Sequence, residues 1–113
     1  MQVVDLLKDP AFLKLNVELV SIAPDPPEMW RNDGAEYGLK DFSTVLTDEQ
    51  NEVAARYDVL KWRHPITGEP GHTFILVNEE GRIQWIRDYG APEHGSIMYV
   101  VPDALVGELS LQL

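Results

Sequence analysis

Two β-type segments of this chain are each followed directly by a helix-capping sequence. Residues 17–22 alternate in hydrophobicity and predict a strand. Asp25 follows as an N-cap, with Pro26 at the first helical position and Glu28 completing a capping box. Because successive strands separated by helices pair in parallel, this order restricts the first half of the chain to an α/β arrangement.

The second unit repeats that pattern. Residues 42–46 predict a shorter strand, and Thr47 with Gln50 forms the next capping box. The helix behind this box places three apolar side chains on one face: Val53, Ala54 and Tyr57. We expect the preceding helix to end at Gly34 or Gly38.

The chain opens with a helical pattern over residues 1–8, which the Asp9-Pro10 pair breaks, and residues 11–15 predict one more helical turn. Near the other end, Pro102 opens a final helix. One face of that helix is apolar: Leu105, Val106 and Leu109.

The second half of the chain centres on residues 73–77, which are almost continuously apolar and predict a strand buried on both faces. Residues 60–71 precede it as a loop. Residues 78–81 predict a tight turn with Gly81 in the left-handed region, and residues 82–88 return as an alternating strand. A hairpin forces one antiparallel pair, so we predict a single α/β domain over residues 1–113 whose mixed sheet is flanked by helices.

Composition restricts the partners. The 113 residues carry 9 Lys+Arg against 19 Asp+Glu, a net charge of −10, which disfavours nucleic acids and anionic membranes. With no long apolar run, the sequence predicts a soluble, cytoplasmic protein. The chain contains no cysteine, which excludes disulfides, thiolate metal sites and cysteine catalysis by its own residues.

Candidates for other chemistry are few. Three histidines and two nearby glutamates could hold a metal: His64, His72, His94, Glu69 and Glu93. Their spacing matches no compact ligand pattern, so we expect ordinary histidines and no metal or other cofactor. No serine lies in a Gly-x-Ser-x-Gly elbow, and close acidic pairs arise by chance in so acidic a chain, so neither a hydrolase nor acid/base catalysis is supported.

The order and spacing of several strings resemble the thioredoxin-fold redoxins, the alkyl hydroperoxide reductase/thiol-specific antioxidant family with its peroxiredoxin-like members. The strings that carry the resemblance are residues 17–27, 45–49, 52–59, 71–83 and 98–100. The resemblance implies a thioredoxin-like fold and an antioxidant or thiol-disulfide oxidoreductase activity. That activity needs a thiolate, so we expect this chain alone to be inactive and assign no catalytic residue.

The resemblance also implies that a strand and the reactive-cysteine loop are missing ahead of residue 1, an N-terminal truncation. The missing strand would lie in the middle of the sheet, between residues 17–22 and 73–77. Either those two strands pair directly or another chain covers them. Since an open strand edge invites pairing, we predict a homodimer through that edge, and a thiol-redox partner if a longer form exists.

Three residues are weak candidates for contact with a substrate or partner. Gly71 and His72 stand where the resemblance implies the rim of an active site, and Trp62 lies in a loop beside Arg63 and His64. For Trp62, Trp30 and Trp85 alike we favour packing in the core or in a lid over lining a binding cleft, with Trp85 against a helix and Trp62 the most exposed. Two functions therefore remain open: a redoxin scaffold without its thiol, or a non-catalytic binding or oligomerisation module on the same scaffold.

Overall fold

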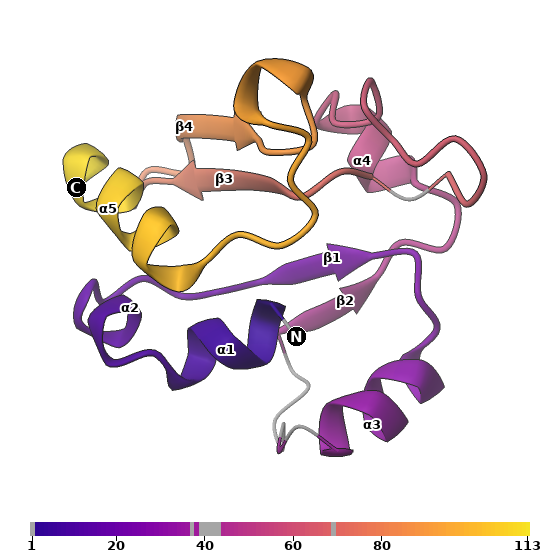
Figure 1. The fold of residues 1–113 in the computed structure, drawn as a ribbon, viewed down its shortest axis with the longest axis horizontal. Helices are drawn as coiled ribbons and strands as arrows, with labels where there is room; N and C mark the ends of the chain where they lie inside the picture. Colours follow the sequence, from indigo (N-terminus) through magenta and orange to yellow (C-terminus); the bar gives the residue numbers. More distant parts are fainter. Residues whose placement is uncertain (1, 37, 39–43, 69) are drawn as a thin grey trace.

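The computed structural model describes residues 2–36, 38, 44–68 and 70–113. Helices and strands alternate from α2 to β3, and two helices open the chain (Figure 1). They are, in order, α1 Gln2–Lys8, α2 Pro10–Lys14, β1 Ser21–Ala23, α3 Pro27–Glu36, β2 Val45–Thr47, α4 Glu52–Arg56, β3 Thr73–Val77, β4 Ile83–Asp88, the 3₁₀ turn η1 Pro92–His94 and α5 Pro102–Gln112.

The four described strands form two separate two-stranded sheets. β1 pairs in parallel with β2, and β3 pairs antiparallel with β4. The mixed α/β class and both pairing directions are as predicted, but a single continuous sheet is wrong for the described residues. β1 and β3 do not pair directly; a cleft lies between them.

A hydrophobic core joins the two ends of the chain. Its buried side chains come from α1, α2, β3, α5 and the segment between β4 and α5: Leu6, Phe12, Leu76, Tyr89, Val100, Leu105 and Leu109. As predicted, Leu105 and Leu109 share the buried face of α5, with Val106 and Trp85 packed beside them. Burial raises the pKa of the Tyr89 phenol, whose ring meets Phe74 edge-on.

The β3–β4 hairpin follows its sequence closely. Gly81 adopts φ +81° in the turn, and its N–H donates to the Asn78 carbonyl at 3.0 Å. The Asn78 side-chain oxygen also accepts from the N–H groups of Glu80 and Arg82, each at 3.0 Å. An asparagine that satisfies the turn and a glycine that tolerates positive φ explain why the chain reverses here.

The amino-terminal helices also follow prediction. Asp9 interrupts the helix, and its carboxylate accepts from the Phe12 N–H at 2.9 Å to cap α2. α3, however, begins at Pro27, one residue later than predicted, so the residue ahead of it is Pro26 and not Asp25. The helix ends at Glu36, between the two predicted glycines, and Gly38 follows at φ +85°.

The second predicted cap is wrong. Thr47 belongs to β2, and α4 begins only at Glu52. The carboxylate of Asp48 caps this helix instead, because it accepts from the N–H groups of Val53 and Ala54 at 3.2 and 2.9 Å. A buried carboxylate that accepts from two N–H groups caps the helix more strongly than the Thr47 hydroxyl, which donates to the Asp25 carbonyl instead. Of the predicted strand at residues 42–46, positions 42 and 43 lie outside the described residues.

Two strand predictions need correction. The strand predicted over residues 17–22 is assigned only as β1, Ser21–Ala23; in its register, residues 17–19 would face positions 41–43, which lie outside the described residues. β3 has the predicted bounds, but it is not buried on both faces: of its five residues Leu76 alone is buried, and Val77 is 46% exposed. Its unpaired edge lines the cleft.

Candidate functional site

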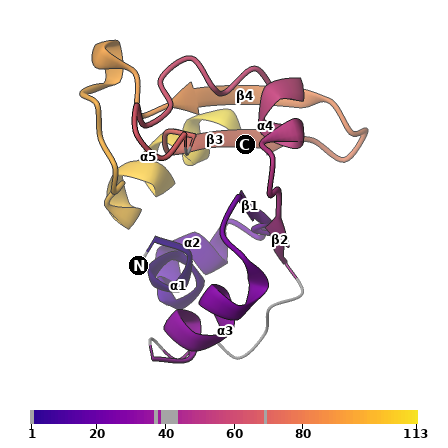
Figure 2. The same ribbon diagram turned by 90° about the vertical axis from the view of Figure 1, so that its right-hand side faces the viewer.

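The cleft between β1 and β3 is a large concavity among the described residues, at about 1390 Å³. Figures 1 and 2 both place β1 and β3 on facing edges of the two sheets. Residues 15–25 line it on one side and residues 70–80 on the other, and Val53, Ala54 and Tyr57 of the α4 segment add a further part. These three were predicted to share a face, and that face borders the cleft. The cleft also extends to α1 and to four further positions: Gln2, Val3, Leu6, Trp30, Val59, Gln84 and Leu113.

The backbone of β3 presents polar groups to this cleft. The His72 carbonyl accepts from the Tyr89 N–H at 2.9 Å, which fixes His72–Tyr89 as a hydrogen-bonded pair of the antiparallel ladder. Such pairs alternate with pairs whose N–H and C=O groups point outward. Thr73 and Ile75 therefore direct their backbone groups away from β4, to the cleft edge.

β1 is arranged in the same way. The Ser21 N–H donates to Thr44 and the Ala23 carbonyl accepts from Asp48, both at 2.8 Å, so these two residues face β2. Ile22 stands between them and must direct its N–H and C=O to the opposite edge, which borders the cleft. Each wall of the cleft is thus the free edge of a strand.

The side chains along the walls are mostly apolar and incompletely covered. Val20, Ile22 and Val77 are 42–49% exposed, and Phe74 and Ile75 are half-buried. Apolar side chains beside unpaired strand edges are the features that another strand covers when it joins a sheet.

The charged side chains described along the cleft are predominantly acidic. Among its described lining residues, the carboxylates and histidines are Glu18, Asp25, Glu79, Glu80 and His72. No lysine or arginine is among the lining residues that the structure describes. The cleft therefore favours a cationic occupant over an anionic one.

The three residues predicted from sequence to make contacts are only partly brought together. Gly71 and His72 line the cleft, whereas Trp62 does not. Gly71 has a packing role: a Cβ built on it would lie 3.2 Å from Cα of Gly90 and 3.1 Å from Oδ1 of Asp88. Trp62 is 41% exposed, and the ammonium of Lys61 lies 5.3 Å from its ring. Their assignment to partner binding stays a prediction.

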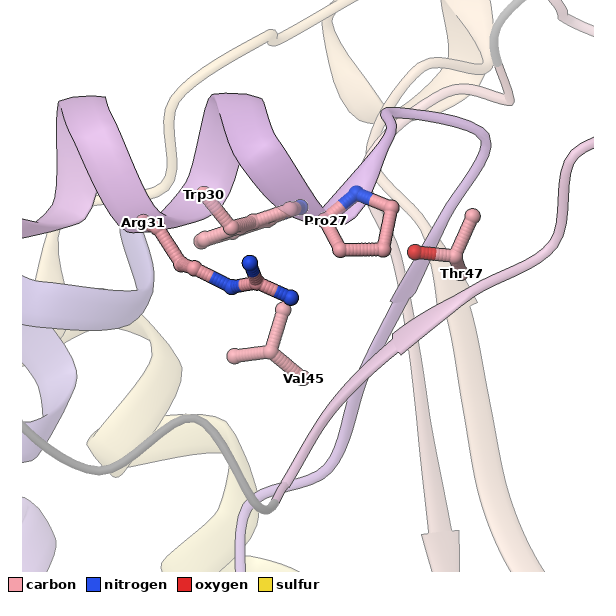
Figure 3. A pocket seen from close by; sticks show the side chains of 5 residues that line it. All are labelled: Pro27, Trp30, Arg31, Val45 and Thr47. Carbon is pink, nitrogen blue, oxygen red and sulfur yellow. The ribbon is translucent and has the colours of Figure 1, made fainter.

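A smaller hollow of about 170 Å³ lies between α3 and β2 (Figure 3). Pro27, Trp30 and Arg31 line it from the helix, and Val45 and Thr47 line it from the strand. It is below the size of ordinary small-molecule pockets, about 300–1,000 Å³. We regard it as a packing gap.

Other chemistry is sparse in the part of the chain that the structure describes. No three His, Asp or Glu residues there form a group that could hold a metal, and Glu69 lies outside that part. The Tyr99 hydroxyl donates a hydrogen bond of 2.5 Å to the Asp5 carboxylate, which connects α1 to the segment before α5. This hydrogen bond lowers the pKa of the Asp5 carboxyl and raises the pKa of the Tyr99 hydroxyl. No described helix has the length and apolar character needed to cross a membrane.

The redoxin resemblance implied a missing strand between residues 17–22 and 73–77 and left direct pairing of those strands open. It did not identify the backbone groups that line the cleft observed there. The N–H and C=O groups of Ile22 and Ile75 point to the cleft only because of the register in which each strand pairs with its neighbour. The signal available beforehand was the apolar run at residues 73–77, too apolar for the edge of a two-stranded sheet.

No family model, curated protein or solved structure matches this chain. The resemblance to redoxins therefore remains a prediction.

Proposed function

We propose that this protein is a binding module that accepts one extended strand between β1 and β3. The observation that carries the proposal is the cleft whose two walls are free strand edges. A strand placed there would receive hydrogen bonds from Ile22 on one side and from Thr73 and Ile75 on the other.

The size of the cleft also favours a peptide. At about 1390 Å³ it exceeds the usual range for small-molecule pockets, and its length follows a five-residue strand. A small molecule would leave the backbone groups of both edges to water, whereas a strand satisfies both.

On this proposal the bound strand unites the two sheets into one mixed sheet in the order β2, β1, guest, β3, β4. That order is the thioredoxin-like arrangement that the redoxin resemblance implies. Since the chain has no cysteine, any thiol-disulfide or peroxide chemistry would require a thiolate from the partner. The binding function requires none.

The test uses an uncharged, end-blocked peptide that alternates valine or isoleucine with threonine. We expect amide hydrogen exchange, followed by NMR, to slow at Ile22, Thr73 and Ile75 when the peptide is added. Unchanged exchange at these amides at saturating peptide would refute the proposal.

A matched pair of proline substitutions localises the binding. Ile75→Pro removes an N–H that faces the cleft, and Ile86→Pro removes the N–H of its cross-strand partner, which faces the outer edge of β4. Both keep the hydrogen bonds between β3 and β4, so their unfolding midpoints should be similar. We expect Ile75→Pro alone to weaken peptide binding, by about tenfold or more. Equal binding by the two variants would contradict the proposal.

The homodimer predicted from sequence is one form of the same function, with a second copy supplying the strand. Sedimentation of the free chain, with and without the peptide, tests it. A dimer that dissociates as peptide is added indicates that a second copy occupies the cleft.

A further inference from the structure

We infer that the strand accepted by this cleft belongs to a different protein, runs antiparallel to β3 and carries lysine or arginine at its amino-terminal end. This inference rests on the proposed function and deepens it, because it states the direction and charge of the guest. Three observations support it: the signs of the lining charges, their position along the cleft, and the unequal lengths of the two walls.

The lining charges are concentrated at one end. Glu18 lies ahead of β1, whereas Glu79 and Glu80 follow β3. In the view of Figure 1 the arrow of β1 points to the right and that of β3 to the left, so the start of β1 and the end of β3 both lie toward the left of that view. Among the described lining residues, Asp25 is the carboxylate beyond the carboxyl end of β1. Of these described carboxylates, three therefore lie beyond the first end of the strands, which we call the acidic mouth, and one lies beyond the other end.

Local pairing does little to neutralise the acidic mouth. Arg82 lies 4.0 Å from Glu80, but their side chains are 82% and 76% exposed, and so exposed an ion pair contributes little. Glu18 and Glu79 are also exposed. Their charges are available to a cation that arrives at this mouth.

The walls set the direction of the guest. β3 offers five residues and β1 only three. Antiparallel pairing is somewhat more stable per residue than parallel pairing, so the guest gains more by lying antiparallel to the longer wall. It then runs parallel to β1, which places its amino-terminal end beside Glu18, Glu79 and Glu80. Its middle must be apolar to cover Ile22, Phe74 and Val77.

Charge also distinguishes a foreign strand from a second copy. Each copy carries a net charge of −10, so two copies approach against mutual repulsion. A basic segment of another protein approaches with attraction. The structure therefore favours a heterologous, basic-ended strand as the occupant.

The experiment compares peptides that share one apolar core of valine, isoleucine and threonine. One has a pair of lysines at its amino-terminal end, one has the pair at its carboxyl-terminal end, one has a pair of glutamates at its amino-terminal end, and one is uncharged. Fluorescence anisotropy at low salt measures their affinities. We expect the first peptide to bind roughly tenfold more tightly than the second, and the third to bind most weakly. The preference should shrink as salt is raised.

Two triple variants provide the control. Glu18→Gln, Glu79→Gln and Glu80→Gln together should abolish the preference for amino-terminal lysines while the uncharged peptide still binds. Asp33→Asn, Glu36→Gln and Glu49→Gln remove three exposed carboxylates that do not line the cleft and should leave the preference intact.

The outcomes separate the inference from the proposed function. Tighter binding of the carboxyl-terminal lysine peptide would overturn the direction, and equal affinities would overturn the role of charge, while either result leaves strand binding standing. A dimer that resists displacement by every peptide would overturn the foreign occupant. Failure of all peptides, the uncharged one included, to bind a monomeric chain would refute the proposed function itself.

Discussion

The two halves of this molecule differ sharply in how much they bury. α1, α2, β3 and α5 share a core in which Leu6 and Leu105 are fully buried. In contrast, α3 buries one residue, Gly34, and neither β1 nor β2 buries any. One half has a packed core, and the other leaves apolar side chains such as Val20, Ile22 and Leu46 42–49% exposed.

β3 belongs to both halves, which explains the difference. Leu76 is buried in the core, while the edge of the same strand lines the cleft. Packing between side chains can be completed by helices within one chain, but a strand edge needs another strand. The packed half should therefore determine the stability of the free protein, and the open half should respond to a partner.

Core truncation gives the largest predicted effect. Leu105→Ala removes a fully buried side chain from α5 and should lower the free energy of unfolding by about 2–5 kcal/mol. Ile22→Ala, on the open side where the residue is 42% exposed, should lower it by about 0.5 kcal/mol or less. Urea denaturation of both variants measures the difference. Similar losses would mean that the two halves contribute equally and that the comparison is wrong.

A glycine pair gives a smaller contrast. Gly71→Ala places a methyl group 3.1–3.2 Å from the Asp88 carboxylate and Cα of Gly90, so we expect a loss of about 1–3 kcal/mol. Gly107→Ala in α5 meets nothing within 4 Å and should stabilise the protein by about 0.5–1 kcal/mol. Thermal unfolding distinguishes the two directions. A neutral Gly71→Ala would show that the approach of residues 71 and 90 is not tight, and would leave Gly71 open to the partner-binding role predicted from sequence.

The elements that could be predicted best from the sequence are those whose structure depends on residues nearby in the chain. The turn at Asn78 and Gly81 and the break at Asp9 are satisfied within a few residues, and all appear as predicted. Strand length was harder to predict, since residues 17–20 have the alternation of a strand but only Ser21–Ala23 is paired among the described residues. The site was harder still, because which backbone groups are free follows from register between distant segments.

The cap of α4 depends both on residues nearby in the chain and on the pairing of β2 with a distant strand. Substitutions at this cap give the smallest predicted effect. Thr47 and Asp48 are adjacent and both can cap, so sequence alone favoured the capping box, whereas the parallel pairing of β2 with β1 holds Thr47 in the strand. Asp48→Ala should therefore cost about 0.5–2 kcal/mol, through loss of the two hydrogen bonds to α4. Thr47→Ala should cost less than about 0.5 kcal/mol, since it removes one exposed hydrogen bond to the Asp25 carbonyl. Urea denaturation measures the free energy of unfolding of both variants. A larger decrease for Thr47→Ala than for Asp48→Ala would mean that Thr47 caps the helix, as predicted from sequence. The start of α4, which borders the cleft, would then differ from the one described.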